Sequence, residues 1–492
     1  MFYKSTRGEE KVTSSKAIAQ GLASDGGLFV PESFPQINIS DLKGKDYIAQ
    51  ADCILGKYLT DYSADELKAA VQFAYNDNSF PDGAVALSDV KKDVSVLELW
   101  HGATFAFKDM ALQLLPHILT KAIEKVGEKK TVVILVATSG DTGKAALAGF
   151  SDVAGTKIVV FYPSGGVSDI QKLQMVTQKG GNVSVVAVKG NFDDAQTGVK
   201  KLFADNALNK ELSDKGYVFS SANSINWGRL VPQIVYYFNS YTSLLEKGNI
   251  KEGEKVNFAV PTGNFGNILA GFYAKCMGLP VNKFICASNS NNVLSDFIKT
   301  GCYDRKREFH KTISPSMDIL VSSNLERMLY SLAGKDSVQI TAWMKDLENK
   351  GSYDIGEKYK KIMQENFYGA WLDDKATEET INKVFADEKY LMDTHTAVAW
   401  AALEDYRKNT GDQTYSIVLS TASPFKFAAD VLDSLEPSFK ANDAFLALAR
   451  LSELSGLKIP ESMQELKKLP VLFEKTIDKT AMKDELENIL GV

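Results

Sequence analysis

The chain has 492 residues, of which 45% are hydrophobic and 24% charged, and its formal net charge is -6 at pH 7. This length predicts two or three domains, and the composition excludes wholesale disorder. Because nucleic-acid-binding proteins normally carry a basic face, the acidic balance argues against a nucleic-acid partner.

The cellular compartment is suggested by three absences in the sequence. The polar start MFYKSTRGEEK has no apolar core of a secretory signal, and no apolar run approaches the roughly 20 residues that span a bilayer. The cysteines form no CxxC pair and are typical of small core residues in a reducing compartment; they are Cys53, Cys276, Cys286 and Cys302. We therefore expect a cytoplasmic protein with no membrane partner.

Residues 1–93 are expected to form a small, mainly helical N-terminal domain. Apolar positions fall at helical spacing from Ser63 to Asn76, and Pro31 and Pro35 punctuate the loops before this helix. Near residue 94 the pattern changes, which predicts a domain boundary there.

Residues 94–435 alternate between short β-branched runs and amphipathic stretches. Six runs predict buried strands of a mostly parallel sheet: VVILVAT, KIVVFYP, VSVVAV, VNFAVPT, KFICAS and YSIVLST. Three stretches between them have the period of crossover helices: Ser168 to Gln178, Asp193 to Ala204 and Gly228 to Leu245. The alternation predicts an α/β fold.

Two later segments are expected to be helical. From about 300 to 395 the chain is highly charged, and a solvated helical insertion is favoured over an anion-binding patch. Residues 436–492 are again amphipathic and are expected to pack on the outside as a C-terminal helical segment.

Three predicted strands run directly into loops that open helices: ATSGDTGKAALAGF, VPTGNFGNILAGF and STASPFKFAAD. In an open parallel sheet such loops lie together at the carboxyl ends of the strands, where ligands bind. The sequence therefore predicts one shared site.

The loop GNFGN has Gly263 and Gly266 on either side of an aromatic residue, directly before an apolar helix. Backbone amides at such a helix start can converge on a phosphate. An ordinary strand-to-helix turn has the same pattern, so the loop alone leaves both interpretations open.

The loop SGDTGK resembles the Walker phosphate loop but departs from it at Thr138, where glycine is needed, and at Ala145, where serine or threonine is needed. Nucleotide hydrolysis therefore loses its main support. What remains is a set of hydroxyls and amides at a helix start that could hold a carboxylate or a second phosphate: Ser139, Gly140, Thr142 and Gly143.

Lys108 follows an apolar, aromatic segment in HGATFAFKDMALQLL. Partial burial would lower its pKa and suit it to form a Schiff base. A surface lysine at a helix start, with Asp109 as its neighbour, is the alternative.

Other catalytic patterns are poorly represented. The histidines lack the spacing of metal ligands, and no GxSxG motif occurs, so neither a metal site nor a serine hydrolase is expected. The histidines are His101, His117, His310 and His395.

Together these motifs resemble the threonine synthases, pyridoxal-phosphate enzymes of fold type II that are related to the tryptophan synthase β-subunit. The resemblance covers nearly the whole chain and rests on five segments in the family's order: LASDGGLFVPE, HGATFAFKD, SGDTG, GNFGN and DTHTAVA. Ala103 stands where the family usually has proline. The resemblance implies two mostly parallel-sheet lobes flanked by helices, with residues 94–435 binding the cofactor.

The resemblance also implies how pyridoxal 5'-phosphate is bound. Lys108 would form the Schiff base, and Thr421, in STASPFKF, would face the pyridine nitrogen as a neutral partner. Ser423 stands where the family often has histidine. The cofactor phosphate would be held by the amides of Gly263, Asn264, Phe265, Gly266 and Asn267.

The implied substrate is O-phospho-L-homoserine, with L-threonine and phosphate as products. Ser139 and Thr142 are candidates for its carboxylate. In SANSINWGR, the candidates for its phosphate are Ser224, Asn226 and Arg229, the last offering a forked guanidinium. A surface ion pair is the alternative role for Arg229.

Two rival functions stay open from the sequence. One is a threonine synthase-like phospho-lyase acting on O-phosphothreonine, or another eliminating enzyme on the same scaffold. The other is a catalytically inactive relative that acts as a binding protein. In either case we expect a monomer or small homo-oligomer.

Overall fold

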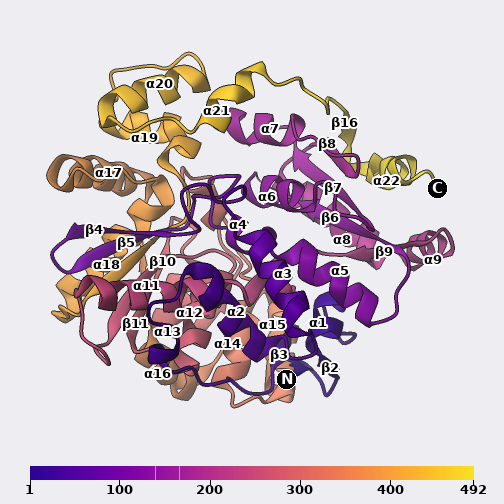
Figure 1. Cartoon of the computed structure of the whole chain (residues 1–492), viewed down its shortest axis with the longest axis horizontal. Coiled ribbons are helices and arrows are strands. Elements are labelled where there is room, and N and C mark those ends of the chain that lie inside the picture. The colour runs from indigo at the N-terminus through magenta and orange to yellow at the C-terminus, as the bar shows by residue number, and fades with distance from the viewer. Residues whose placement is uncertain (139, 166) are drawn as a thin grey trace.

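The computed structural model describes residues 1–138, 140–165 and 167–492. Two parallel sheets with helices on both faces make up most of the chain (Figure 1). The predicted α/β fold with two mostly parallel-sheet lobes is confirmed, and all six predicted strands are strands in the structure.

The N-terminal region contains a small antiparallel sheet in the order β2-β1-β3, in addition to the expected helices. The predicted helix at 63–76 is α3, which begins with a capping box between Ser63 and Glu66. The elements are β1 (Phe2–Ser5), β2 (Lys11–Thr13), α1 (Ser14–Gln20), β3 (Phe29–Pro31), η1 (Ile39–Asp41), α2 (Tyr47–Tyr58) and α3 (Ala64–Ala74).

The first large sheet has six strands in the order β14-β11-β10-β15-β5-β4. All neighbours are parallel except β4 and β5, which form an antiparallel hairpin. The predicted domain boundary at residue 93 falls in the turn of this hairpin, so β4 belongs to this sheet and not to the N-terminal unit. The strands are β4 (Ala86–Lys91), β5 (Val94–Glu98), β10 (Val256–Pro261), β11 (Val281–Ser288), β14 (Phe367–Trp371) and β15 (Ser416–Ser420).

The second large sheet has five parallel strands in the order β16-β8-β7-β6-β9. Its edge strand β16 comes from the C-terminal segment and lies beside β8 (Figure 1). That segment was expected to be purely helical, and the difference arises because β8 offers a free edge to the returning chain. The strands are β6 (Thr131–Ala137), β7 (Thr156–Pro163), β8 (Val183–Lys189), β9 (Tyr217–Ser220) and β16 (Thr476–Asp478).

The central strands of both sheets are buried on both faces, so side chains that point in opposite directions enter different hydrophobic clusters. In β11, Phe284 and Cys286 pack on the side of α12 (Gly266–Cys276), whereas Ile285 and Ala287 pack on the side of α18 (Thr394–Thr410). The β-branched runs of the second sheet divide in the same way between two hydrophobic clusters. This double burial explains why the strands appear in the sequence as continuous apolar runs.

Helices between the strands cover these faces. In the first half of the chain they are α4 (Asp109–Leu112), α5 (Leu115–Lys125), α6 (Asp141–Phe150), α7 (Asp169–Val176), α8 (Phe192–Ala204), α9 (Asn206–Asp214), α10 (Trp227–Leu230) and α11 (Gln233–Lys247). In the second half they are α12 (Gly266–Cys276), α13 (Val293–Thr300), α18 (Thr394–Thr410), η3 (Pro424–Phe427), α19 (Ala428–Leu435), α20 (Ala444–Ser455), α21 (Glu461–Glu465), η4 (Leu466–Lys468), η5 (Lys479–Ala481) and α22 (Met482–Leu490).

The charged segment between 300 and 395 is more than a solvated helical insertion. It supplies β14, the edge strand of the first sheet, and a two-stranded antiparallel ribbon of β12 and β13. Its other elements are helical. They are β12 (Cys302–Asp304), η2 (Pro315–Met317), α14 (Leu325–Leu332), α15 (Ser337–Lys350), β13 (Ser352–Asp354), α16 (Gly356–Asn366) and α17 (Asp374–Glu388).

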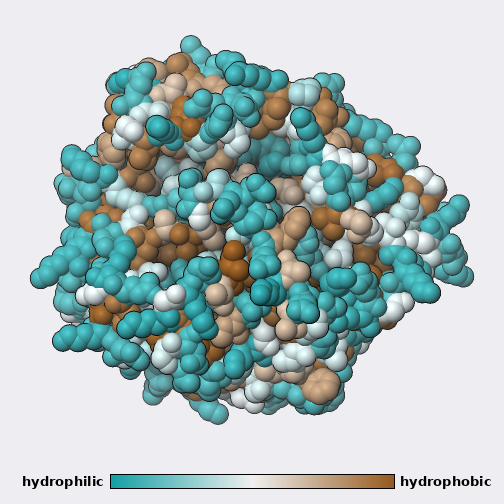
Figure 2. Space-filling model, viewed as in Figure 1, coloured by the Kyte–Doolittle hydropathy of each residue, from teal (hydrophilic) through white to brown (hydrophobic). Residues whose placement is uncertain are grey.

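The face of the molecule in Figure 2 is mostly hydrophilic, with hydrophobic residues scattered in small groups. Across the residues that the structure describes, no helix combines the length and apolar character needed to cross a bilayer.

Candidate active site

Three strand-end loops meet around Ser316, which lies in η2. Asp141, at the start of α6, accepts a hydrogen bond from the Ser316 hydroxyl at 3.2 Å. Lys426, in the turn after β15, lies 2.8 Å from the same carboxylate. A Cβ added to Gly263, after β10, would lie 2.7 Å from the Ser316 carbonyl oxygen. These contacts confirm that the three loops share one site.

Backbone contacts with the loop after β15 fix the segment that carries Lys108. The Phe107 N–H donates to the Thr421 carbonyl at 2.9 Å, and the Ser423 N–H donates to the Phe105 carbonyl at 3.0 Å. Phe105 adopts a φ of 59°, a left-handed conformation that is uncommon for a bulky residue. The turn at Phe105 therefore places Lys108 at the start of α4, beside the other loops.

The Lys108 amine is largely buried, and its side chain is 14% exposed. Its Nζ lies 3.5 Å from Ser316 Oγ and 3.6 Å from Asp141 Oδ2. Burial lowers the pKa of Lys108, the Asp141 carboxylate opposes that shift, and two neighbouring cations reinforce it. A lowered pKa leaves more neutral amine near neutral pH, which suits a lysine that bonds to a carbonyl carbon.

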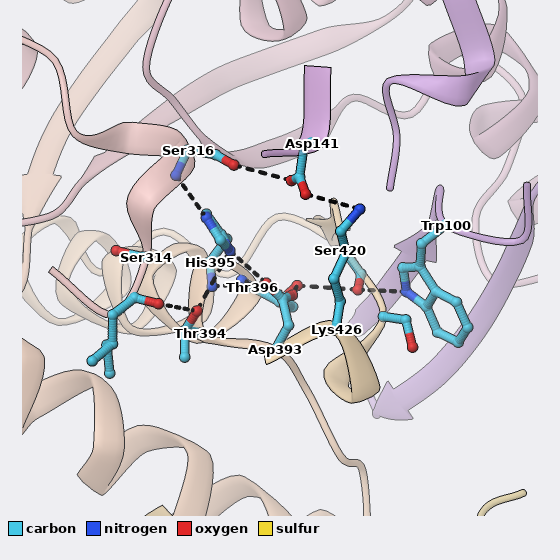
Figure 3. A network of polar contacts seen from close by, with 12 residues as sticks. Trp100, Asp141, Ser314, Ser316, Asp393, Thr394, His395, Thr396, Ser420 and Lys426 are labelled. Atoms are coloured by element: carbon cyan, nitrogen blue, oxygen red, sulfur yellow. Dashed lines mark hydrogen bonds and ion pairs between the residues drawn. The ribbon is translucent and has the colours of Figure 1, made fainter. Parts of the chain in front are cut away.

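Asp141 is the charged centre of the site and lies between Ser316 and Lys426 (Figure 3). Its Oδ1 contacts Lys426 Nζ at 2.8 Å and accepts a hydrogen bond from Gln171 at 2.8 Å. Burial would raise the pKa of this carboxyl, but the ammonium groups of Lys426 and Lys108 outweigh burial and hold the pKa well below its usual range. Asp141 is therefore ionised.

A buried histidine and aspartate hold the segment of Ser316 in place (Figure 3). The Ser316 N–H donates to His395 Nε2 at 3.1 Å, and His395 Nδ1 lies 2.7 Å from Asp393 Oδ2. Because Nε2 accepts a hydrogen bond, the ring carries its proton on Nδ1 and donates it to Asp393. The pair joins the start of α18 to the centre of the site.

The GNFGN loop turns sharply before α12. Phe265 has a φ of 63°, again in the left-handed region. The Ser322 hydroxyl donates to the Gly263 carbonyl at 2.8 Å, and the Asn324 N–H donates to the Asn264 carbonyl at 3.0 Å. These bonds use carbonyl groups of the loop, whereas the first N–H groups of α12 have no partner within the helix. The loop can therefore offer several amide donors to an anion.

Asn267 adds a side-chain donor at the same place. Its Oδ1 accepts hydrogen bonds from Tyr236 at 2.7 Å and Tyr237 at 2.9 Å, which fixes the orientation of the amide. Its buried Nδ2 has no partner among the described residues. Because an unpaired buried donor is costly, a bound anion at this helix start would satisfy it.

Two of the three residues predicted to bind the substrate phosphate lie near this site. Ser224 Cβ would be 3.8 Å from a Cβ on Gly266, which places Ser224 beside the start of α12. Arg229 is 4% exposed, so its predicted alternative role as a surface ion pair is wrong. Its guanidinium donates to the Ala222 carbonyl, and its Nε has no partner within the described ranges. Burial lowers the pKa of Arg229 to about 10.

Asn226 has a different role from the one predicted. Its Oδ1 accepts from the Gly228 N–H at 2.9 Å and caps α10, and its Nδ2 donates to the Ile18 carbonyl at 3.0 Å. The side chain is fully buried and its polar atoms are engaged within the protein. The structure therefore contradicts a substrate-binding role, because the amide is already used to cap a helix and to hold α1.

Two more of the predicted residues belong to the strand-end loops and to the helix starts that follow them. Thr142 is half-buried in the first turn of α6, and Thr421 is 6% exposed directly after β15. Ser139 lies outside the described residues. In the described parts of the chain, no group of three or more histidine, cysteine or acidic side chains could hold a metal ion.

Five residues of this site have no role predicted from the sequence. Asp141, Lys426, Asp393 and His395 stand within motifs that it quoted, but no role was assigned to them. Ser316 stands outside those motifs, and no sequence signal marks it.

Family models match three consecutive parts of the chain. Residues 2–75 match the threonine synthase N terminus, residues 86–357 match the pyridoxal-phosphate dependent enzymes, and residues 396–482 match the C-terminal part of threonine synthase. The chain belongs to the threonine synthase family. The resemblance read from the five motifs is confirmed.

Individual relatives support the same assignment. Threonine synthase-like 1 of Homo sapiens is 38% identical over 97% of this chain, which spans 64% of the length of that protein. Threonine synthase of Saccharomyces cerevisiae is 36% identical over 88% of this chain and 89% of that protein. A pyridoxal-phosphate-bound threonine synthase structure from Brucella melitensis has a TM-score of 0.88 and 34% identity, with 100% of both chains covered.

The cofactor of this family, and of this chain, is pyridoxal 5'-phosphate. The residues present fit it at both ends. The unpaired Nδ2 of Asn267 and the start of α12 suit its phosphate, and the buried Lys108 amine suits its aldehyde.

Proposed function

We propose that this chain converts O-phospho-L-homoserine and water to L-threonine and phosphate. The observation that carries the proposal is the buried Lys108 amine, which lies within 3.6 Å of both Ser316 Oγ and Asp141 Oδ2 where the strand-end loops meet. The match to threonine synthase of Saccharomyces cerevisiae supports it, because that match extends over most of both chains.

Lys108 has two tasks in this proposal. Its amine would hold the cofactor, and as a free amine it would move the proton of the substrate Cα. Bound pyridoxal 5'-phosphate supplies the electron withdrawal that lets protons leave Cα and Cβ and the γ-phosphate depart. Asp141 and Ser316 orient the amine between its two tasks, since both lie at contact distance from its Nζ.

The cofactor phosphate is assigned to uncharged donors. We infer that it binds the amides of the GNFGN loop together with Asn267 Nδ2: the residues are Gly263, Asn264, Phe265, Gly266 and Asn267. Thr421 offers a neutral hydroxyl for the pyridine nitrogen, which leaves that nitrogen less protonated than an aspartate would.

The substrate is assigned to residues at the start of α6 and in the segment that leads into and includes α10. Thr142, in the first turn of α6, and Ser139, which lies outside the described residues, are proposed to bind its carboxylate. Ser224 and Arg229 are proposed to bind its phosphate, because Arg229 is buried with an Nε that has no partner among the described residues. Asn226 is not part of the proposed substrate site, because its side chain caps α10.

A second candidate function is that of a phospho-lyase which releases 2-oxobutyrate from O-phosphothreonine. It is favoured by the relatives named threonine synthase-like 1, which match this chain at 38% identity over 97% of its length. The site loops would serve both reactions, since each begins with removal of a Cα proton.

Product analysis separates the two functions. The purified chain, loaded with the cofactor, is incubated with O-phospho-L-homoserine and, in parallel, with O-phosphothreonine. Equal amounts of threonine and phosphate from the first substrate support the proposal. Phosphate with 2-oxobutyrate as the main product supports the phospho-lyase instead. A cofactor-treated protein without a visible absorbance band, and without product, would indicate a binding protein.

We further propose a cytoplasmic enzyme that works as a monomer or small homo-oligomer without nucleic acid. The free state of the cysteines Cys53, Cys276, Cys286 and Cys302 and the net charge of -6 support this. Light scattering of the purified chain measures the oligomeric state directly.

A further inference from the structure

Lys426 is a second lysine at the site, and no step of the proposed reaction uses it. Its side chain is 0% exposed, and its Nζ contacts Asp141 Oδ1 at 2.8 Å and donates to the Thr104 carbonyl at 2.8 Å. Because a buried ammonium is costly unless it is paired, the position of Lys426 depends on Asp141.

Asp141 contacts its two lysines unequally. Its Oδ1 makes a direct contact with Lys426 at 2.8 Å, whereas its Oδ2 is 3.6 Å from Lys108, beyond ordinary hydrogen-bond distance. The Ser316 hydroxyl donates to Oδ2 at 3.2 Å. The carboxylate is therefore fully satisfied by Lys426, Gln171 and Ser316 without a charge on Lys108.

The sum of the charges on Lys108, Lys426 and Asp141 also favours a neutral Lys108. Two ammonium groups and one carboxylate leave an excess positive charge in a buried pocket, and a neutral Lys108 removes that excess. Only a neutral amine can bond to an aldehyde carbon. A Lys108 ammonium must therefore give up one proton to solvent before its amine could hold the cofactor.

We propose that Lys426 is the permanent counter-ion of Asp141 and thereby allows Lys108 to be neutral and ready to bond to the cofactor. This inference rests on the proposed role of Lys108. Lys426 acts through Asp141, so it is a positioning residue and not a catalytic one.

The other charged groups around the cluster do not replace Lys426. Arg229, on α10, adds positive charge near Lys108 and so favours the same neutral state. Near Lys426 lie Lys144 of α6 and the buried Asp109 of α4, and the positive charge of Lys426 acts to lower the pKa of both groups. Asp109 is satisfied by Thr104, which donates through its N–H at 2.7 Å and its hydroxyl at 2.8 Å.

The test measures the protonation of Lys108 in the full-length chain without cofactor. Trace labelling with acetic anhydride at a series of pH values, read by mass spectrometry of the Lys108 peptide, gives the midpoint at which the amine loses its proton. Lys426→Met should raise this midpoint by roughly one pH unit. The positive charge that repels a Lys108 ammonium is lost, and the Asp141 carboxylate then has Lys108 as its partner in charge. Asp141→Asn should lower it by roughly one unit, because the attracting charge is lost.

Shifts of the Lys108 midpoint in opposite directions distinguish a counter-ion from a lysine with a merely structural role. If Lys426 and Asp141 only held the pocket together, both variants would loosen it and shift the midpoint in the same direction. A midpoint that is unchanged or lowered in Lys426→Met would overturn the proposal. Lys121→Met is the matched control, because Lys121 is 43% exposed and pairs with Glu124 at the surface. It should leave the Lys108 midpoint unchanged.

A charge-neutral double variant covers the case in which Lys426→Met alone does not fold. Asp141→Asn combined with Lys426→Met should have a higher Lys108 midpoint than Asp141→Asn alone, and an equal or lower one would again overturn the proposal. Because the labelling needs neither substrate nor product, it is independent of whether the chain makes threonine.

Discussion

The two ends of the cofactor site are built from different kinds of groups. At one end, Lys108, Asp141 and Lys426 form a buried cluster of charges. At the other end, the GNFGN loop offers backbone amides and the neutral side chain of Asn267. The difference follows the chemistry, because a reacting amine needs a controlled proton affinity, whereas a phosphate needs several donors in fixed positions. We therefore expect the reactivity of Lys108 at the first end to depend on nearby charges and on pH. Cofactor binding at the second end should depend on the positions of the donors and on the space around them.

The largest effect is expected at the charged end. Lys108→Ala removes the amine that bonds to the cofactor and moves the Cα proton, so threonine formation should fall by at least about 10³-fold. The visible absorbance band of the loaded protein should disappear as well. Circular dichroism should match the wild type, since among the described residues the amine makes only the two long polar contacts with Ser316 and Asp141, at 3.5 and 3.6 Å. Retention of the band would contradict the role given to Lys108.

At the neutral end, Asn267→Ala should weaken cofactor binding by roughly 10- to 100-fold, the loss of one hydrogen bond to a charged group. A titration of the cofactor followed by fluorescence measures this affinity. Tyr236→Phe is the matched control, because it removes a hydrogen bond to Asn267 Oδ1 and leaves Nδ2 in place. If both variants lost affinity equally, the unpaired Nδ2 would not be a phosphate donor.

Substitutions at the two glycines of the loop test protein stability and cofactor binding separately. Gly263→Ala should destabilise the cofactor-free protein by about 1–3 kcal/mol, because its Cβ would lie 2.7 Å from the Ser316 carbonyl oxygen. In Gly266→Ala the nearest atom to the Cβ would be 3.5 Å away, so its stability should be unchanged. We nevertheless expect Gly266→Ala to bind the cofactor less tightly, because the phosphate approaches its backbone. Denaturant unfolding and the cofactor titration measure the two effects.

The smallest effect concerns pH. Because burial lowers the pKa of Lys108, cofactor uptake should rise with pH and level off below the ordinary range of a lysine. Below that midpoint the neutral fraction, and with it the uptake rate, grows about tenfold per pH unit. Asn267→Ala should lower the plateau without moving the midpoint by more than about half a unit. A larger shift of the pH midpoint in Asn267→Ala would show that the phosphate end of the site affects the protonation of Lys108.

Much of the fold was predictable because it depends on local patterns. The six buried strands are continuous apolar runs, and the helices between them carry a clear 3.6-residue period. The strands β14 and β16 were missed because they are short edge strands whose pairing is set by distant parts of the chain. Their sequences alone do not distinguish them from loops.

The site was predictable only in part, for a related reason. Lys108 and the GNFGN loop belong to motifs with a recognisable order, so they could be named from the sequence. Asp141 and Lys426 are 285 positions apart in the sequence, from 141 to 426. Only the fold brings Asp141 Oδ1 and Lys426 Nζ to 2.8 Å from each other. Asn226 shows the opposite error, because a polar residue at a helix start is as suited to capping as to binding.

The most direct test of this account identifies the lysine that holds the cofactor. The loaded protein is reduced with borohydride, which makes the bond between lysine and cofactor permanent, and the peptides are then analysed by mass spectrometry. We predict that the cofactor remains attached to Lys108. Attachment to Lys426, which contacts Asp141, or to Lys144, which is on the same helix as Asp141, would contradict the account.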